Sequence, residues 1–336
     1  MNSLRDVVLD RDQDGMLMLR WEAPAGLTVE IGAGATPEPD EHVIVATAAG
    51  GALRLDPAPP HRYVSLRAGE GPAIVVAERR VRFDGITNLR DLGGYATADG
   101  GTTRWGRVFR ADALHKLTAG DLTAFDALGI ATVYDLRSEL ERGEFPNPCP
   151  SQHVPIVGRP ADAPAPAPSP SMTTREGEER LRDLYVGALE HSADAIGSIL
   201  RGIAAGPGPV LFHCHGGKDR TGIVAAVLLL TLGVDRELVL DDYEATRRYR
   251  LPEHQQDSFA NMIAAGIPPE AAAGVLGTPR WAMAAAVDAI EGPLGGIEAY
   301  LDGPAGVDAA TRDALRDLLL VRHPGPAVER AALERS

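Results

Sequence analysis

The pattern of hydrophobic and polar positions changes near residue 80. Before that point, short apolar runs with partial alternation are separated by Gly, Pro and Asp turns. Alternate side chains of a strand face opposite sides of a sheet, so these runs predict strands. The predicted strands lie at 16–23, 27–34, 42–48, 52–57, 62–69 and 73–81.

Short strands at this spacing are typical of an all-β architecture. The spacing predicts a small β-rich domain over residues 1–80, which resembles a fibronectin-III-like sandwich. Trp21 and Tyr63 are its expected core aromatics.

From residue 81 onward, strand patterns alternate with helix patterns. Strands are predicted at 106–112, 130–138, 153–158 and 208–214, and helices at 118–129, 178–206 and 221–234. This alternation predicts an α/β domain over 81–323, with a central, mostly parallel sheet flanked by helices.

Two segments have a composition that disfavours packed structure. Residues 158–179 are rich in Pro, Ala and polar residues, which favours a mobile insertion. Its role as a lid over a site and its role as a solvated surface loop are both open. Residues 324–336 are expected to be a frayed tail.

Charge and cysteine content narrow the classes of function. The net charge of −14 argues against nucleic acid as a partner, so an anionic ligand needs a local basic pocket. The longest apolar run is shorter than the roughly 20 residues of a membrane-spanning helix, so no integral membrane segment is expected. The N-terminal sequence lacks a secretory signal pattern, and a cytoplasmic location is expected, with secretion by another route left open.

Only two cysteines occur, and one lies in the stretch HCHGGKDRTG. A strand that ends at Cys214 and a helix that begins near Arg220 would wrap loop N–H groups around one point, which can bind an oxyanion. The same N–H groups favour thiolate over thiol. Arg220 could hold two phosphate oxygens, and Thr221 could donate to the departing sulfur. These parts predict phosphoryl transfer to cysteine.

The neighbouring residues of the loop have simpler roles. Gly216 and Gly217 allow tight turns and close backbone approach, and His215 lies within the phosphate-binding loop. His213 is expected to orient the loop or tune the thiolate. A metal site is rejected, because consecutive strand residues face opposite ways and no second Cys/His cluster completes a tetrahedral set.

The spacing Cys-x5-Arg-Thr resembles the signature loop of cysteine-dependent protein tyrosine phosphatases. The whole stretch is similar to the subgroup of mycobacterial PtpB-like and Listeria LipA-like tyrosine and lipid phosphatases. Segments 85–100, 106–112, 133–138, 232–246 and 295–301 resemble this subgroup in the same order, over roughly 83–322. The resemblance implies that Cys214 is the nucleophile and Arg220 the phosphate-binding arginine.

The resemblance also implies roles for Lys218 and Asp219, which lie between Cys214 and Arg220. Lys218 would add charge for polyanionic substrates such as phosphoinositides, and Asp219 would act as general acid. Asp135 is the alternative acid, although its role is more simply to orient Arg137 or the phosphate loop.

Two further motifs have structural interpretations. Residues 88–95 (NLRDLGGY) are interpreted as a turn, with backbone groups satisfied by Asn88, Arg90 and Asp91 and positive φ at Gly93 and Gly94. Residues 247–250 (RRYR) fit either a basic rim for acidic substrates or a solvated helix end.

The sequence therefore predicts a cytosolic phosphatase that hydrolyses phosphate monoesters through a cysteinyl-phosphate intermediate, with no metal or organic cofactor. Phosphotyrosine is the first expected substrate, and phosphoserine, phosphothreonine and phosphoinositides stay open. The alternative is a non-catalytic module that binds a phosphorylated partner. The role of the N-terminal strands is not assigned.

Overall fold

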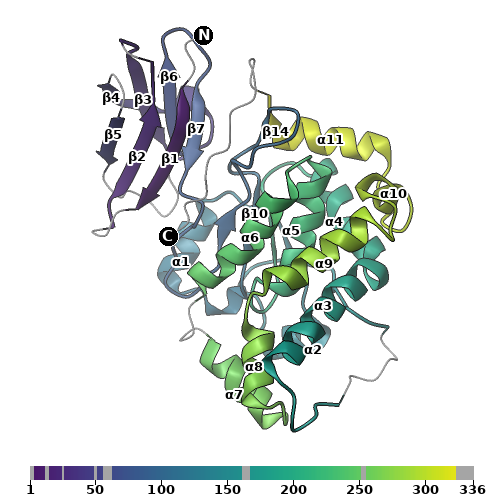
Figure 1. Cartoon of the computed structure of the whole chain (residues 1–336). Coiled ribbons are helices and arrows are strands. Elements are labelled where there is room, and N and C mark those ends of the chain that lie inside the picture. Colours follow the sequence, from purple (N-terminus) through teal and green to yellow (C-terminus); the bar gives the residue numbers. More distant parts are fainter. Residues whose placement is uncertain are drawn as a thin grey trace.

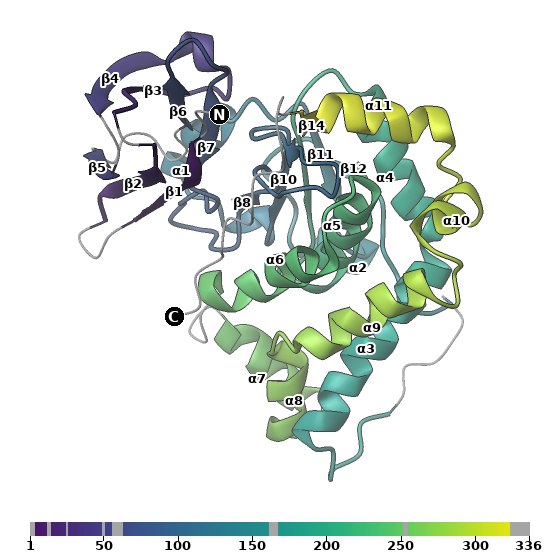
Figure 2. The same ribbon diagram turned by 45° about the horizontal axis from the view of Figure 1, so that its top comes forward.

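The computed structural model describes residues 4–11, 15–24, 26–48, 51–55, 63–160, 167–250 and 255–322. The predicted tail at 324–336 lies outside the described residues, as do residues 161–166 of the predicted insertion. The described residues form a mixed α/β structure with several sheets and eleven α-helices. In both views the N-terminal strands lie to one side of the helices (Figures 1 and 2).

The described N-terminal part forms two antiparallel sheets, with strand orders β1-β2-β5 and β4-β3-β6-β7. Six strands overlap the predicted runs, whereas β1 was not predicted. The strands are β1 (Arg5–Arg11), β2 (Leu17–Glu22), β3 (Val29–Gly34), β4 (Val43–Ala48), β5 (Gly51–Leu55), β6 (Tyr63–Ala68) and β7 (Ile74–Ala77).

The two N-terminal sheets share one apolar cluster. Trp21 from β2 packs there with residues such as Ile31 and Val64 of the other sheet. Tyr63 is also buried, but it lies outside this cluster, and a Cβ built on Gly106 would be 2.7 Å from its hydroxyl. Tyr63 is therefore a buried aromatic, as predicted, but its hydroxyl lies against Gly106 rather than in the cluster of Trp21. The fibronectin-III-like classification stays a prediction.

The central sheet has the order β12-β11-β13-β10-β8. Its first four strands pair in parallel, and β8 is antiparallel to β10. The predicted strand at 153–158 was wrong beyond His153, because only the two residues of β12 pair. The strands are β8 (Arg90–Asp91), β10 (Val108–Ala111), β11 (Thr132–Asp135), β12 (Gln152–His153) and β13 (Val210–His213).

Both faces of the central sheet are covered. Val210 and Phe212 of β13 belong to a large cluster built mainly with helices, whereas Leu211 between them belongs to a second cluster that includes Phe125 of helix α1. This alternation places successive side chains on opposite faces, as a strand requires. Both faces being apolar explains the nearly continuous hydrophobic run before Cys214.

Helices and short pairings complete the described fold. Strand β9 (Thr102–Thr103) pairs with β14 (Leu320–Val321), and single 3-10 turns are η1 (Pro39–Glu41) and η2 (Leu114–Lys116). The helices are α1 (Ala119–Asp126), α2 (Glu139–Glu144), α3 (Thr174–His191), α4 (Ala193–Ala205), α5 (Asp219–Thr231), α6 (Arg236–Tyr249), α7 (Gln256–Ala264), α8 (Pro269–Leu276), α9 (Arg280–Glu291), α10 (Ile297–Asp302) and α11 (Ala309–Leu319).

Helix α3 corrects two boundaries expected from the sequence. It begins at Thr174, inside the predicted insertion at 158–179, because Thr173 and Glu176 form a capping box. It ends before Ser192, whose hydroxyl bonds to both the N–H and the carbonyl of Val157. The predicted helix at 178–206 is thus divided into α3 and α4. The lid role of the insertion stays a prediction.

None of the described helices is both long and apolar enough to cross a bilayer. The apolar segment after Arg220 is instead helix α5, whose residues are almost all buried. It packs against the central sheet and against α6.

Candidate active site

The cysteine loop joins strand β13 to helix α5. The strand ends at His213 and the helix begins at Asp219, which leaves Cys214 at the base of the loop with only 1% of its surface exposed. Gly217 has φ of +65°, and a Cβ there would lie 2.6 Å from the Ala111 carbonyl oxygen of β10. Glycine is therefore required at this position both for its conformation and for the close approach to β10.

The carbonyl groups of the loop are bonded away from its centre. Asn88 Nδ2 donates to the Gly216 carbonyl at 3.0 Å, and the Ala113 N–H donates to the His215 carbonyl at 3.1 Å. Arg110 Nη2 donates to the carbonyls of Gly217 at 2.7 Å and Lys218 at 3.3 Å. Four consecutive carbonyls are thus held by the surrounding protein.

This arrangement fixes the direction of the loop amides. In a trans peptide the N–H points opposite to the carbonyl of the same plane. The N–H groups of 216–219 therefore point away from the donors that hold the carbonyls of 215–218. Within the described residues, no acceptor takes the N–H groups of 216–218. A row of unpaired amides at a helix N-terminus, next to a cysteine sulfur, is an anion-binding cradle.

Arg220 lies in the first turn of α5 and is bound by a carboxylate. Its Nη1 and Nη2 donate to the two oxygens of Glu141 at 2.6 and 2.7 Å, and 22% of its side chain is exposed. Burial acts to raise the pKa of Glu141, but the hydrogen bonds and charge of Arg220 outweigh it and lower the pKa to about 2. Glu141 therefore stays ionised and fixes the guanidinium plane.

Glu141 was missed by the sequence reasoning. Its signal is the Ser138-x-x-Glu141 spacing of a capping box, in which Glu141 Oε2 accepts from the Ser138 N–H at 2.9 Å. That pattern predicts the start of helix α2 but says nothing of Arg220, which is 79 residues away.

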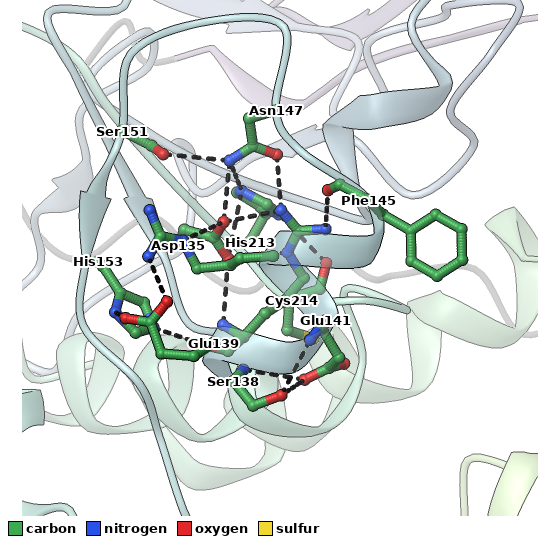
Figure 3. A network of polar contacts seen from close by, with 12 residues as sticks. Asp135, Ser138, Glu139, Glu141, Phe145, Asn147, Ser151, His153, His213 and Cys214 are labelled. Atoms are coloured by element: carbon green, nitrogen blue, oxygen red, sulfur yellow. Dashed lines mark hydrogen bonds and ion pairs between the residues drawn. The ribbon is translucent and has the colours of Figure 1, made fainter.

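Asp135 and Arg137 form a buried ion pair, and Asp135 lies close to His213 and Asn147 in Figure 3. Arg137 donates to both Asp135 oxygens, at 2.9 and 2.8 Å. Burial acts to raise the pKa of Asp135, but the hydrogen bond from Arg137 leads the effects that lower it. A buried carboxylate held in this way favours the orienting role of Asp135, and its alternative assignment as general acid stays a prediction. The geometry agrees with an orienting role.

His213 connects the surroundings of Asp135 and Arg137 to the nucleophile. Asn147 Nδ2 contacts His213 Nε2 at 3.0 Å, while His213 Nδ1 lies 3.2 Å from the Cys214 carbonyl oxygen (Figure 3). Burial lowers the pKa of His213 to about 4. The ring is therefore neutral at pH 7, and since the amide donates to Nε2, the proton sits on Nδ1 and bonds to the Cys214 backbone.

Lys218 and Asp219 lie at the start of α5. The Lys218 ammonium is buried and donates to the carbonyls of Val275 at 2.6 Å and Gly277 at 2.5 Å, at the end of α8. Burial lowers the pKa of Lys218. Its nitrogen also lies 3.4 Å from Asp219 Oδ1, and 29% of the Asp219 side chain is exposed. Asp219 is thus the accessible acidic group of the loop.

The remaining predicted residues border the loop. The Thr221 hydroxyl is buried and lacks a partner among the described residues, so it is free to donate. The His215 ring lies 6.2 Å from the Phe145 ring and 6.4 Å from the His115 ring, and burial lowers the pKa of His215. The described residues contain no group of three or more His, Cys, Asp or Glu that could hold a metal ion.

Residues 88–95 do more than form a turn. Asn88 holds the phosphate loop, and Arg90 donates to Asp242 of α6 at 3.0 Å. Gly94 has positive φ as predicted, but Gly93 does not. The turn interpretation is confirmed for Asp91, whose Oδ1 accepts from the Gly93 N–H at 2.8 Å. Asn88 and Arg90 bond instead to segments that are distant in the sequence.

The RRYR segment ends helix α6. Arg247 and Arg248 are exposed. Arg250 is buried, and a Cβ on Gly216 would lie 2.6 Å from its Nη1. The segment therefore combines a solvated helix end with one arginine against the loop.

Asp242 joins the two arginines that support the loop. Its oxygens accept from Arg90 and Arg110, and all three side chains are buried. Burial acts to raise the pKa of Asp242, but the two arginine charges outweigh it and hold the pKa well below its usual range. The carboxylate is therefore a structural counter-ion for two buried cations.

We expect Asp242→Asn to lower the free energy of unfolding by about 3–5 kcal/mol, because it leaves two buried arginines without their counter-ion. Since the folded pKa lies below the unfolded value of about 3.9, the stabilisation is present above that pH and is lost as pH falls. Urea unfolding at several pH values measures both effects. The exposed Asp317→Asn is the control, with a change under about 0.5 kcal/mol; equal changes in the two variants would contradict the role of Asp242.

Comparisons with known proteins agree with this geometry. The profile described as the tyrosine phosphatase family matches residues 81–321. The triple specificity protein phosphatase PtpB of Mycobacterium tuberculosis is 30% identical over 274 residues, which cover 70% of this chain and 97% of that protein. A Cupriavidus necator relative, whose name assigns it to the tyrosine-protein phosphatases, is 30% identical over 248 residues, 72% of this chain and 90% of its own.

A solved structure, P. aeruginosa TpbA, matches 53% of this chain and 94% of its own at 18% identity. Its TM-score of 0.24 is too low to support an argument about this chain. The family match covers the strands and helices that build the cysteine loop and its supports. The chain therefore belongs to the tyrosine phosphatase family, as an enzyme of the protein tyrosine phosphatase class.

Proposed function

We propose that this protein hydrolyses phosphate monoesters through a cysteinyl-phosphate intermediate on Cys214. The observation that supports it most is the set of outward-bonded carbonyls at 215–218, which turns the intervening amides toward one point beside the cysteine. Such a cradle binds the phosphate oxygens and favours the thiolate.

In the first step, the Cys214 sulfur forms a bond to phosphorus while the bond from phosphorus to the ester oxygen breaks. Asp219 gives a proton to the departing oxygen. In the second step, water attacks phosphorus, its proton goes to Asp219, and the sulfur–phosphorus bond breaks. Inorganic phosphate and the regenerated thiolate are the products, with Thr221 as the hydroxyl that donates to the sulfur.

Arg220 and the loop amides stabilise the transition state. A planar guanidinium can bond to two phosphate oxygens at once, and charge spreads over these oxygens during transfer. The bidentate pair with Glu141 sets the guanidinium before the substrate arrives, which avoids the reorganisation cost of ordering a long side chain. No metal or organic cofactor takes part in these steps.

We propose phosphotyrosine as the first substrate, with phosphoserine, phosphothreonine and phosphoinositides as further classes. A role of Lys218 toward polyanionic substrates requires its ammonium to give up the carbonyls of Val275 or Gly277, which it holds in this structure. A panel of phosphopeptides and inositol lipids, assayed with the full chain, ranks these classes. The N-terminal strands are proposed as a fibronectin-III-like sandwich followed by a phosphatase domain over 81–323.

We expect Asp219→Asn to lower kcat by about 10²-fold or more for an alkyl phosphate and much less for a nitrophenyl phosphate. A poor leaving group needs the proton that Asp219 supplies, whereas a good one departs as an anion. Steady-state kinetics with both substrates measure the difference. Equal losses for the two leaving groups would overturn the assignment of Asp219 as general acid.

A further inference from the structure

The two oxygens of Asp219 have different surroundings. Oδ1 accepts a hydrogen bond from the Tyr185 hydroxyl at 2.5 Å and lies 3.4 Å from the Lys218 ammonium. Oδ2 accepts no hydrogen bond from the described residues. One oxygen is therefore held by a donor, whereas the other keeps its position open to the leaving oxygen of a substrate.

The Tyr185 hydroxyl that holds Oδ1 belongs to a tightly packed part of the fold. Tyr185 lies on α3 and is fully buried, and its ring meets that of Tyr243 edge to face with centroids 5.9 Å apart. The two hydroxyl oxygens are 2.9 Å apart. Packing on two helices leaves the Tyr185 hydroxyl little freedom to move away from Asp219.

The direction of these hydrogen bonds follows from protonation. Burial, together with the charge of Asp219, raises the pKa of Tyr185 well above its usual value, and burial raises that of Tyr243. Both phenols are therefore protonated at neutral pH. Tyr185 gives its proton to the bond with Asp219 Oδ1, so its oxygen accepts from Tyr243. The chain of donors runs from α6 through α3 to the carboxylate.

We infer that Tyr185 is a positioning residue for catalysis: it holds Asp219 by Oδ1 so that the proton for the leaving oxygen is carried on Oδ2. The inference rests on the proposed function of Asp219 as general acid. A single carboxylate on a half-exposed first turn can rotate, and a misplaced acid loses much of its effect because proton transfer needs hydrogen-bond geometry. Tyr185 acts through Asp219 and does not itself contact the reacting atoms.

The test is Tyr185→Phe in the full chain, which removes the hydroxyl and keeps the ring. We expect kcat for an alkyl phosphate to fall by about tenfold or more, part of the 10²–10⁴-fold effect of a general acid. The kcat for a nitrophenyl phosphate and both KM values should change little. Tyr243→Phe is the matched control: it removes a hydroxyl from the same cluster that does not touch Asp219, and it should give a smaller loss.

The double variant separates positioning from a structural role. In the Asp219→Asn background, Tyr185→Phe should cause no further loss on the alkyl phosphate, since effects through one shared group are not additive. Unchanged vanadate affinity in Tyr185→Phe establishes that the loop is intact. Equal losses for both leaving groups, or a full additional loss in the double variant, overturn the inference while the role of Asp219 stands. If Asp219→Asn itself shows no leaving-group dependence, the proposed acid fails, and the inference fails with it.

Discussion

Cys214→Ser is expected to abolish turnover of aryl phosphates, with kcat lower by about 10⁴-fold or more, the scale seen when a covalent nucleophile is removed. Serine keeps the size of the side chain, but its hydroxyl is not ionised by the loop amides at neutral pH. The hydrogen bonds to the carbonyls of 215–218 do not involve the sulfur, so the anion-binding cradle is retained. Binding of a phosphotyrosine peptide, measured by calorimetry, should persist.

Cys149→Ser is the matched control for the nucleophile. Cys149 is half-buried against the cluster on the α1 face of the sheet, whereas Cys214 belongs to the opposite cluster. Activity should therefore survive in the Cys149 variant. Substantial turnover in Cys214→Ser would contradict the covalent mechanism, and loss of both turnover and peptide binding would point to a collapsed loop.

Arg220→Lys is expected to lower kcat by about 10³-fold or more, within the range that an arginine at a transferring phosphoryl group supplies. Lysine keeps the positive charge but cannot bond to two phosphate oxygens in one plane, nor to both oxygens of Glu141. The loss should appear in kcat and in kcat/KM, because the interaction is strongest in the transition state. Stopped-flow kinetics with a nitrophenyl phosphate measure it.

Arg247→Lys is the control for charge alone. Arg247 is exposed in the last turn of α6, and its charge is kept in the variant. Its kinetics should match those of the unmodified chain. If Arg220→Lys were as active as this control, the planar guanidinium would not be the transition-state clamp.

The phosphate loop could be predicted from sequence because its parts are contiguous. The apolar run of β13, the glycine pair and the first turn of α5 fall within a few residues, so local rules fix their order in space. The covered central sheet followed in the same way from the alternation of apolar and polar segments. The expectation that Asp219 is the acid came from the resemblance, and the hydrogen bond from Tyr185 to its Oδ1 became visible only in the structure.

The supports of the loop could not be predicted, because each comes from far along the chain. Asn88 bonds to a carbonyl 128 residues away, and Arg110 reaches one 107 residues away. The sequence around each is locally compatible with a turn or a strand, and no periodicity indicates a distant partner. Tyr185 is a further example, because its place on the apolar face of a predicted helix indicates only a buried aromatic and no polar partner.

The most direct test of the central claim is rapid acid quench of the full chain during turnover of a radiolabelled aryl phosphate, followed by peptide mapping. We predict that label accumulates on the peptide that contains Cys214 and that it is absent from Cys214→Ser. Label on another residue, or steady-state turnover with no labelled protein at any quench time, would contradict the cysteinyl-phosphate mechanism.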